Sequence, residues 1–348
     1  MKKVISLVMV ILMLATVLSA CSGGKNAMDS AAFGSIETTR WFTKVNYYDS
    51  GFNLLKSKIT IFPYIGTVGH PVTDSDRGKV FAVSGIGEFF ANDRLVMIDT
   101  KENKVKKVPT SVSAIFDMYA QGDSAFLING VGMNLVRFDI QTEEEIEFKA
   151  ENSDGVFVYA YGNTVYFVTE NEEDSFLYLL DEKTLNVKKE YKVTEYFRYV
   201  NEMMVVGNKL YIAPSSVSKD SVGTLVCFDI ENETFEEIKL EAAQPCYDMT
   251  LYGEKLIIIN RDTHDPYEQY LTFFDINTHE FKTKVFSIPL EQIEAKGDRL
   301  YCLLDNVALL SEETVLFVID LKEENMPVII RAELSSNDNY SVSSFFML

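Results

Sequence analysis

Residues 156–193 alternate between short apolar runs and short polar breaks. Aromatic and β-branched residues dominate the runs, and these residue types suit a pleated, packed surface. Gly162-Asn163 is a two-residue hairpin signal because both residues tolerate positive φ. Asp181 opens a polar turn in which its carboxylate can accept nearby backbone N–H groups. The segment predicts one four-stranded antiparallel sheet, with strands at Val156–Tyr161, Thr164–Thr169, Phe176–Leu180 and Val187–Val193.

The same pattern recurs along most of the chain. The hairpin glycine returns at steps of 44, 40, 45, 46 and 44 residues, at Gly78, Gly122, Gly162, Gly207, Gly253 and Gly297. The aspartate after the third strand returns at steps of 40, 42, 48, 46 and 45 residues, at Asp99, Asp139, Asp181, Asp229, Asp275 and Asp320. Two landmarks with one period in the forties predict an all-β fold, a β-propeller of four-stranded blades. A β-sandwich with chance turn spacing is the alternative.

The two ends of the chain lack the full pattern and predict one shared blade. Residues 340–348 (YSVSSFFML) have the pattern of a single first strand, and residues 36–62 contain strand-like runs at Thr39–Tyr48, Phe52–Leu55 and Lys58–Phe62. An open ring would leave unpaired blade faces. We therefore expect a composite seventh blade and a propeller domain spanning residues 36–348. Six blades with decorated termini is the alternative.

The turn after each third strand carries a family resemblance. An aliphatic strand runs into Asp and then a Thr- or Asn-containing turn, as in FDIENET, FDINTHE and LDEKTLN. Over residues 78–334 the repeats resemble YVTN-type and PQQ-like propellers. The Gly-His and Trp-Asp pair of WD repeats and the double Gly of kelch repeats are absent. The repeating Trp of quinoproteins is missing too, since Trp41 is the only one. The resemblance therefore implies the fold and no particular activity.

The pattern of residues 1–20 predicts a targeting segment. Lys2 and Lys3 precede an apolar run, Val4–Leu18, that is shorter than the roughly 20 residues of a spanning helix. Leu18-Ser19-Ala20-Cys21 resembles the bacterial lipobox, which implies removal of residues 1–20 and acylation of Cys21. Residues 21–35 are small and polar and predict a flexible tether with a reach of about 20 Å. We expect a lipid-anchored protein on the extracytoplasmic face of a cell membrane. An ordinary signal peptide with a coincidental Cys is the alternative.

Net charge limits the partners. The chain of 348 residues has a formal charge of −20, which becomes −22 once Lys2 and Lys3 are removed. Such a surface repels nucleic-acid phosphates and anionic lipid headgroups, so we expect no nucleic-acid partner. The charge suits solubility, or recruitment of a cationic partner. Three cysteines remain after Cys21, and they predict buried free thiols or one Cys227–Cys246 bridge with Cys302 left over.

The start of the innermost strands supplies a candidate site. Counting back five residues from each hairpin glycine gives mostly polar residues, namely Thr73, Asp117, Phe157, Glu202, Asp248 and Gln292. Aromatic residues lie nearby, and Arg198 adds a cation. The pattern predicts a binding pocket for a polar or cationic ligand at the mouth of the channel, formed by Asp117, Tyr196, Arg198, Glu202, Tyr247, Asp248 and Gln292. A wet channel end without a ligand is the alternative.

Catalytic and metal signals are weak. His264 lies between Asp262 and Asp265 with Glu268 nearby, but one histidine in one loop does not make a zinc site. Asp74 and Asp76 have calcium-loop spacing without the later carboxylates. His70 and His279 complete the histidines, and no triad is evident. We expect no catalytic residues, no metal and no cofactor.

The predicted function rests on the anchor and the loop-bearing face of the ring. We expect a protein-interaction or scaffolding module with an envelope or surface protein partner, because binding residues concentrate on loops over a rigid scaffold. A saccharide- or peptide-binding sensor that uses the pocket is the alternative. A propeller hydrolase or lactonase is less favoured, because it requires catalytic residues that the sequence does not reveal.

Overall fold

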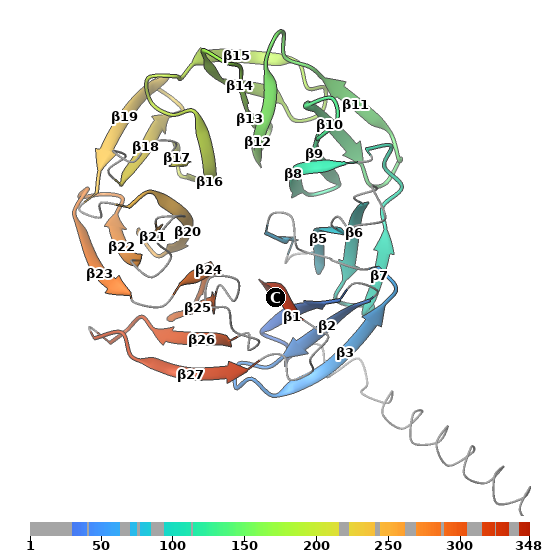
Figure 1. The fold of residues 1–348 in the computed structure, drawn as a ribbon, viewed down its shortest axis with the longest axis vertical. Coiled ribbons are helices and arrows are strands. Elements are labelled where there is room, and N and C mark those ends of the chain that lie inside the picture. The colour runs from blue at the N-terminus through green and yellow to red at the C-terminus, as the bar shows by residue number, and fades with distance from the viewer. Residues whose placement is uncertain are drawn as a thin grey trace, which may run out of the picture.

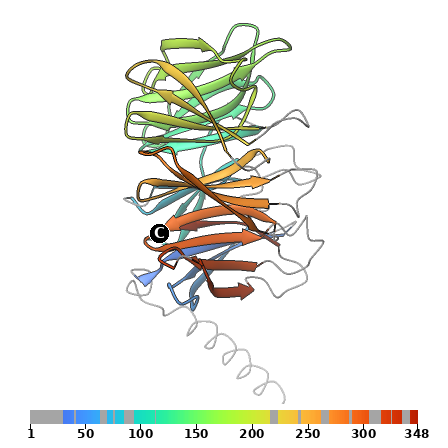
Figure 2. The same ribbon diagram turned by 90° about the vertical axis from the view of Figure 1, so that its left-hand side faces the viewer.

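The chain forms a closed ring of seven four-stranded antiparallel sheets around a central channel (Figure 1). The computed structural model describes residues 30–39, 42–62, 70–74, 77–84, 94–112, 114–215, 223–240, 244–261, 269–286, 289–304, 315–323, 325–333 and 341–348. Figure 1 shows the sheets arranged radially around the axis, and Figure 2 shows the ring from its side. The predicted seven-bladed β-propeller is confirmed, and the sandwich and six-blade alternatives are wrong. Within the described residues no helix is long and apolar enough to cross a membrane.

Each blade runs from an innermost strand beside the channel to an outermost strand on the rim. The first three internal blades are β4 (Val72–Asp74), β5 (Lys79–Ser84), β6 (Arg94–Asp99) and β7 (Lys104–Lys107); β8 (Ile115–Gln121), β9 (Ser124–Asn129), β10 (Asn134–Asp139) and β11 (Glu145–Phe148); and β12 (Asp154–Tyr161), β13 (Thr164–Glu170), β14 (Ser175–Asp181) and β15 (Val187–Lys192). The next three are β16 (Tyr199–Val206), β17 (Lys209–Ser215), β18 (Thr224–Asp229) and β19 (Thr234–Lys239); β20 (Cys246–Tyr252), β21 (Lys255–Arg261), β22 (Gln269–Asp275) and β23 (Phe281–Phe286); and β24 (Leu290–Lys296), β25 (Arg299–Leu304), β26 (Val315–Asp320) and β27 (Val328–Glu333).

The seventh blade joins the two ends of the chain, as predicted. Its order is β28 (Ser341–Met347), β1 (Phe33–Thr38), β2 (Thr43–Tyr48) and β3 (Leu54–Thr60). The propeller thus begins at Phe33, before the expected start at residue 36, because Phe33 is fully buried and its ring lies 5.0 Å from that of Tyr48. The two runs expected at residues 52–55 and 58–62 form the single strand β3, since an outermost strand tolerates the polar residues between them.

The repeated turns have the predicted chemistry. All six hairpin glycines have φ between 58° and 68°, which L-residues rarely adopt. At Asp139, Asp181, Asp229 and Asp275 the turn carboxylate accepts backbone N–H groups two and three residues on. Oδ1 of Asp181, for example, lies 3.1 Å from the nitrogens of both Lys183 and Thr184. These hydrogen bonds lower the pKa of Asp181, with the Thr184 hydroxyl contributing most.

The hydrophobic core is divided among the gaps between neighbouring blades. One cluster, for example, joins Phe126 of β9 and Leu135 of β10 to Val158 of β12 and Phe167 of β13. Such face-to-face packing is how a propeller buries sheets that each have two apolar faces. The three cysteines Cys227, Cys246 and Cys302 are buried and free, which confirms the prediction of free thiols.

Candidate functional site

A β-bulge recurs near the start of the innermost strands. In five blades the pairing with the second strand slips by one residue, just before Asp117, Phe157, Glu202, Asp248 and Gln292. A bulge re-aims side chains and increases the local twist. These are five of the six positions that the hairpin-glycine count selected. The bulge therefore explains why this repeat position matters: the residue that follows it, which is polar in four of the five blades, points toward the channel.

Three of these side chains connect neighbouring blades. The Oδ2 atom of Asp117 accepts the N–H of Val158 at 2.9 Å, and Oδ2 of Asp248 accepts that of Ile293 at 2.8 Å. Gln292 makes two such bonds to Phe345, accepting its N–H at 3.1 Å and donating to its carbonyl at 3.0 Å. Innermost strands have no strand partner on the channel side, so these bonds satisfy backbone groups that would otherwise face the channel unpaired. Asp117, Asp248 and Gln292 therefore have a structural role beside any binding role.

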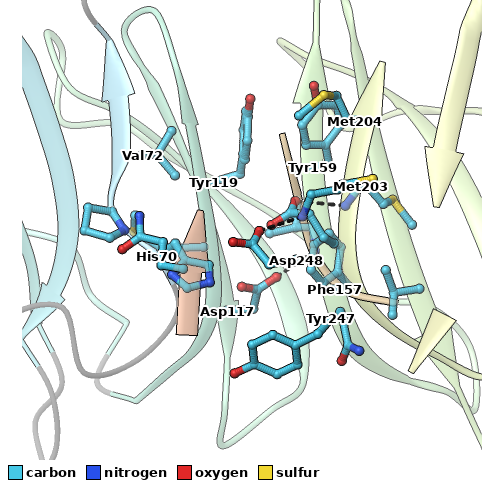
Figure 3. Close-up of a pocket in the computed structure, with 18 of the residues that line it drawn as sticks. His70, Val72, Asp117, Tyr119, Phe157, Tyr159, Met203, Met204, Tyr247 and Asp248 are labelled. Atoms are coloured by element: carbon cyan, nitrogen blue, oxygen red, sulfur yellow. Dashed lines mark hydrogen bonds between the residues drawn. The ribbon is translucent and has the colours of Figure 1, made fainter. Parts of the chain in front are cut away.

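The innermost strands enclose a cavity of about 740 Å³ at the top of the ring, the face where these strands begin. Figure 3 shows His70, Asp117 and Asp248 facing the same space. The described lining includes no Lys or Arg, and His70 is its one group able to carry a positive charge. The acidic side chains of this lining are Asp117, Asp154, Glu170, Glu202, Asp248 and Glu294.

Burial raises the pKa of several of these carboxyl groups. Loss of water around Asp117 raises its pKa to about 7, against the opposing effect of hydrogen bonds from the N–H groups of Val158 and Met118. Desolvation, with repulsion from Asp248, raises the pKa of Glu294 to about 7. Desolvation and repulsion from Asp248 also raise the pKa of Glu202 well above its usual value. The cavity therefore favours a partner that brings positive charge, because such a partner would stabilise the ionised forms.

Aromatic side chains form the rest of the wall, and several are fixed in place. The rings of Tyr119 and Tyr159 lie 4.6 Å apart at 57°, and the Tyr159 hydroxyl accepts the N–H of Val205 at 3.3 Å. The guanidinium of Arg261 lies 3.8 Å from the centre of the Tyr247 ring. The hydroxyl of Tyr247 donates to Glu291 at 3.0 Å. Fixed aromatic faces beside carboxylates are suited to cations, which interact favourably with ring faces.

Five of the seven predicted site residues line this cavity, namely Asp117, Glu202, Tyr247, Asp248 and Gln292. Tyr196 does not, since its ring stacks on Phe235 at 4.9 Å, toward the rim of the ring. Arg198 does not either, because its guanidinium donates to the carbonyls of Glu173 at 2.6 Å and Glu172 at 3.2 Å.

Glu294 and His70 line the cavity although neither was among the predicted site residues. Glu294 lies two residues after Gln292, on the same face of the same strand, so the two-residue period of a strand was the signal that pointed to it. His70 precedes the first blade, where the sequence carries no repeat landmark.

Among the described residues, nothing supports the calcium-like spacing of Asp74 and Asp76 as a metal site. Arg77 forms an ion pair with Asp74 at 3.7 Å, and its backbone N–H donates to Asp74 at 3.1 Å. No group of three His, Cys, Asp or Glu side chains is placed to hold a metal ion in the described part of the chain. The predicted lipidation site Cys21, residue Asp76, and the loop residues Asp262, His264, Asp265 and Glu268 lie outside the described residues.

Comparison with known proteins identifies the fold and nothing finer. The sequence matches no protein-family model and no curated protein. A Bacteroides fragilis protein assigned provisionally as a 6-phosphogluconolactonase has a TM-score of 0.64 at 12% identity, over 92% of this chain and 98% of that one. A Bacteroides uniformis protein with the same provisional assignment has a TM-score of 0.62 at 10% identity, over 92% and 100%.

A protein of unknown function from Desulfotomaculum acetoxidans is similar to the same degree. Its TM-score is 0.61 at 11% identity, over 90% of this chain and 98% of that one. Identities this low show a shared fold and carry no activity with them. By fold, the chain is a seven-bladed β-propeller like these proteins.

Proposed function

We propose that this protein is a lipid-anchored, extracytoplasmic propeller that binds a positively charged ligand in its central cavity. The observation that carries the proposal is the composition of the described lining, with six carboxyl groups and no Lys or Arg. An ammonium or guanidinium group offsets the repulsion between Glu202, Asp248 and Glu294, and the tyrosine faces accept its apolar neighbours. A basic peptide or an amine fits these requirements.

The same lining disfavours a phosphorylated sugar. Two structural neighbours are assigned provisionally as 6-phosphogluconolactonases. A phosphate ester needs cationic or N–H donors around it, whereas this cavity would set its charge against several buried carboxyl groups. The hydrolase or lactonase alternative therefore has the likeness of fold in its favour and the charge of the cavity against it.

Binding of defined probes tests the proposal. We expect spermidine and trilysine to raise the melting temperature, Tm, at physiological salt, whereas chitotriose and 6-phosphogluconate leave it unchanged. A ligand that binds only the folded state stabilises it by RT ln(1 + [L]/Kd). The double variant Glu202→Gln, Glu294→Gln should lose the shift. Glu147→Gln, on the exposed outermost strand β11, should keep it.

Two results would count against the cavity. An equal shift in the double variant would place the bound cation on the acidic surface instead. A shift with 6-phosphogluconate alone would favour the lactonase alternative. Calorimetry at a single stoichiometric site separates cavity binding from diffuse attraction to a chain of charge −20.

The anchor is the second part of the proposal, and the pattern from Lys2 to Cys21 supports it. Mass spectrometry of protein purified from membranes should find an N-terminal diacylglyceryl Cys21. The Cys21→Ser variant should leave the membrane fraction. A free, unmodified Cys21 in membrane-purified protein would refute the proposed lipid anchor and would not bear on the proposed binding of a cation in the cavity.

Protein scaffolding remains a second candidate, favoured by exposed apolar residues on the rim. Val285 of β23 and the pair Val328 and Ile329 of β27 are exposed on neighbouring outermost strands. Exposed apolar groups of this kind are frequent at protein interfaces. Crosslinking in cells through a photoreactive residue at position 285 should recover one envelope protein under this hypothesis, and no discrete product if the rim is unoccupied.

A further inference from the structure

The outermost strands β3 and β7 lie on neighbouring blades and share an unusual charge (Figure 1). β3 carries Lys56 and Lys58 and no acidic residue, and β7 carries Lys104, Lys106 and Lys107 and no acidic residue. The two blades are in direct contact, because Tyr47 of β2 and Val80 of β5 share one core cluster, against which Val105 of β7 packs. Five lysines therefore lie on two neighbouring outermost strands in a chain of charge −20, with Lys56, Lys58 and Lys107 on the faces that the two strands turn toward each other.

Most of these lysines have no acidic partner. Within the described residues, Lys104 pairs with Glu102 at 2.7 Å, and Lys56, Lys58, Lys106 and Lys107 form no ion pair. The three lysines of β15, on another part of the rim, provide the contrast. Their ion pairs are Lys188 with Asp181 at 3.5 Å, Lys189 with Glu233 at 3.2 Å and Lys192 with Asp174 at 2.7 Å. The positive charge on β3 and β7 is thus available to an external partner.

Apolar side chains are exposed beside the lysines of β3. The exposed fractions are 55% for Leu54, 60% for Ile59 and 77% for Ile61, and Phe42, directly before β2, is 45% exposed. Ile59 pairs with Lys44 of β2 and Thr60 with Thr43, so Phe42 and Ile61 follow each other at the same end of the two strands. Successive side chains of a strand point to opposite faces. Lys56 and Lys58 therefore lie on the face of β3 toward β7, and Ile59 and Ile61 lie on the other face. The outer edge of this blade thus carries basic groups on one side of β3 and apolar groups on the other, and both reach a membrane interface that β3 contacts edge-on.

The position of the chain terminus identifies the partner. The described chain begins at Ser30 and enters this same blade as β1. Eight residues separate Cys21 from Ser30, and a flexible linker of that length has a reach of roughly 14–17 Å. If Cys21 is acylated, as proposed above, this blade is held within about that distance of the bilayer. Of the surfaces near the anchor, the described rim of β3 and β7 is basic, whereas the net charge of the molecule repels anionic headgroups.

We propose that this edge of the ring docks on an anionic lipid surface. The docking edge comprises Phe42, Leu54, Lys56, Lys58, Ile59 and Ile61, together with Lys104, Lys106 and Lys107. The lysines contact headgroup phosphates, and the apolar side chains enter the interface. The ring then stands on its rim, so the channel axis lies along the membrane and the cavity mouth stays open to solvent. The orientation rests on the proposed anchor, whereas the affinity for lipid does not.

Vesicle sedimentation tests the docking edge without the anchor. The mature chain from residue 21, carrying Cys21→Ser, is mixed with vesicles of phosphatidylglycerol and phosphatidylcholine or of phosphatidylcholine alone. We expect binding to the anionic vesicles only, weakened by salt. Lys56→Glu with Lys58→Glu should lower the partition at least about tenfold. Lys188→Glu with Lys189→Glu on β15 makes the same change in charge and should match the parent protein.

Three results would overturn the docking edge. The first is no preference for anionic vesicles, and the second is an equal loss in the β15 variant. The third is a dimer or a captured protein that depends on Lys56 and Lys58 while vesicle binding does not, which would give the edge a protein partner. Acylation of Cys21, measured separately by mass spectrometry, decides the anchor. An unacylated protein that still binds through β3 would refute the anchor and support the edge.

Discussion

The carboxyl groups in the cavity make stability depend on pH at the scale of single residues. Desolvation raises the pKa of Asp117 and of Glu294 to about 7, above the unfolded values near 4. A raised pKa contributes stability below the unfolded value, and this contribution is lost as the pH rises toward 7. We therefore expect Asp117→Asn and Glu294→Gln to unfold at higher urea at pH 8 than the parent protein, and to differ little from it at pH 4.

Asparagine at position 117 keeps an oxygen that can accept the N–H of Val158, so the inter-blade bond survives the substitution. Asp117→Ala should be less stable than Asp117→Asn at every pH, by about 1–3 kcal/mol, because it leaves that N–H without its partner. The exposed Glu147→Gln is the control for a change of net charge. Equal urea midpoints for Asp117→Asn and the parent at pH 8 would show that the carboxyl group is not desolvated.

The cavity residues also show which parts of the candidate site could be predicted from the sequence. The hairpin-glycine period located Asp117, Glu202, Asp248 and Gln292, because residues at one repeat position share one place in the ring. Proximity along the chain failed for Tyr196 and Arg198. These two residues precede β16, and the turn there directs one toward Phe235 and the other onto the carbonyls of Glu172 and Glu173. The bulge that aims the polar residues has no local sequence signal.

At the scale of the element, each blade depends on a tight turn between its first two strands. Gly162 joins β12 to β13 with φ of 59°, and an added Cβ would meet no atom within 4 Å. Any cost of Gly162→Ala therefore comes from the backbone conformation alone, about 1–2 kcal/mol. Gly162→Asn should cost less, because Asn tolerates this region. Urea unfolding that ranks Asn as more damaging than Ala would contradict the explanation.

Turn positions are also why the blades could be predicted at all. A required positive φ and an aspartate that accepts backbone N–H groups leave visible residues at fixed places in each of the six internal repeats. The ends of strands have weaker sequence signals than the turns do. The sequence placed two runs where β3 is one strand, and it missed the start of β1 at Phe33, whose burial depends on Tyr48 of the paired strand and on Tyr301 of the next blade.

At the scale of the whole molecule, the ring is held closed by the last strand of the chain. β28 pairs with β1 from Thr38 opposite Ser341 to Phe33 opposite Met347. Phe346 lies directly over Gly34, where an added Cβ would overlap its ring. Phe345 and Phe346 are buried in the cores on the two sides of this blade. The final eight residues therefore connect three blades, and they also form part of the cavity wall.

Removal of residues 341–348 should open the ring. The inner edge of β1 loses its partner, both flanking cores lose a phenylalanine at about 3–5 kcal/mol each, and Gln292 loses its two bonds to Phe345. We expect a lower Tm, loss of the sharp unfolding transition and loss of cation binding. A synthetic peptide of residues 335–348 added in trans should restore all three, because it supplies the missing strand. An unchanged Tm after the deletion would mean that the blades are stable without closure, and that the packing between blades holds the ring without β28.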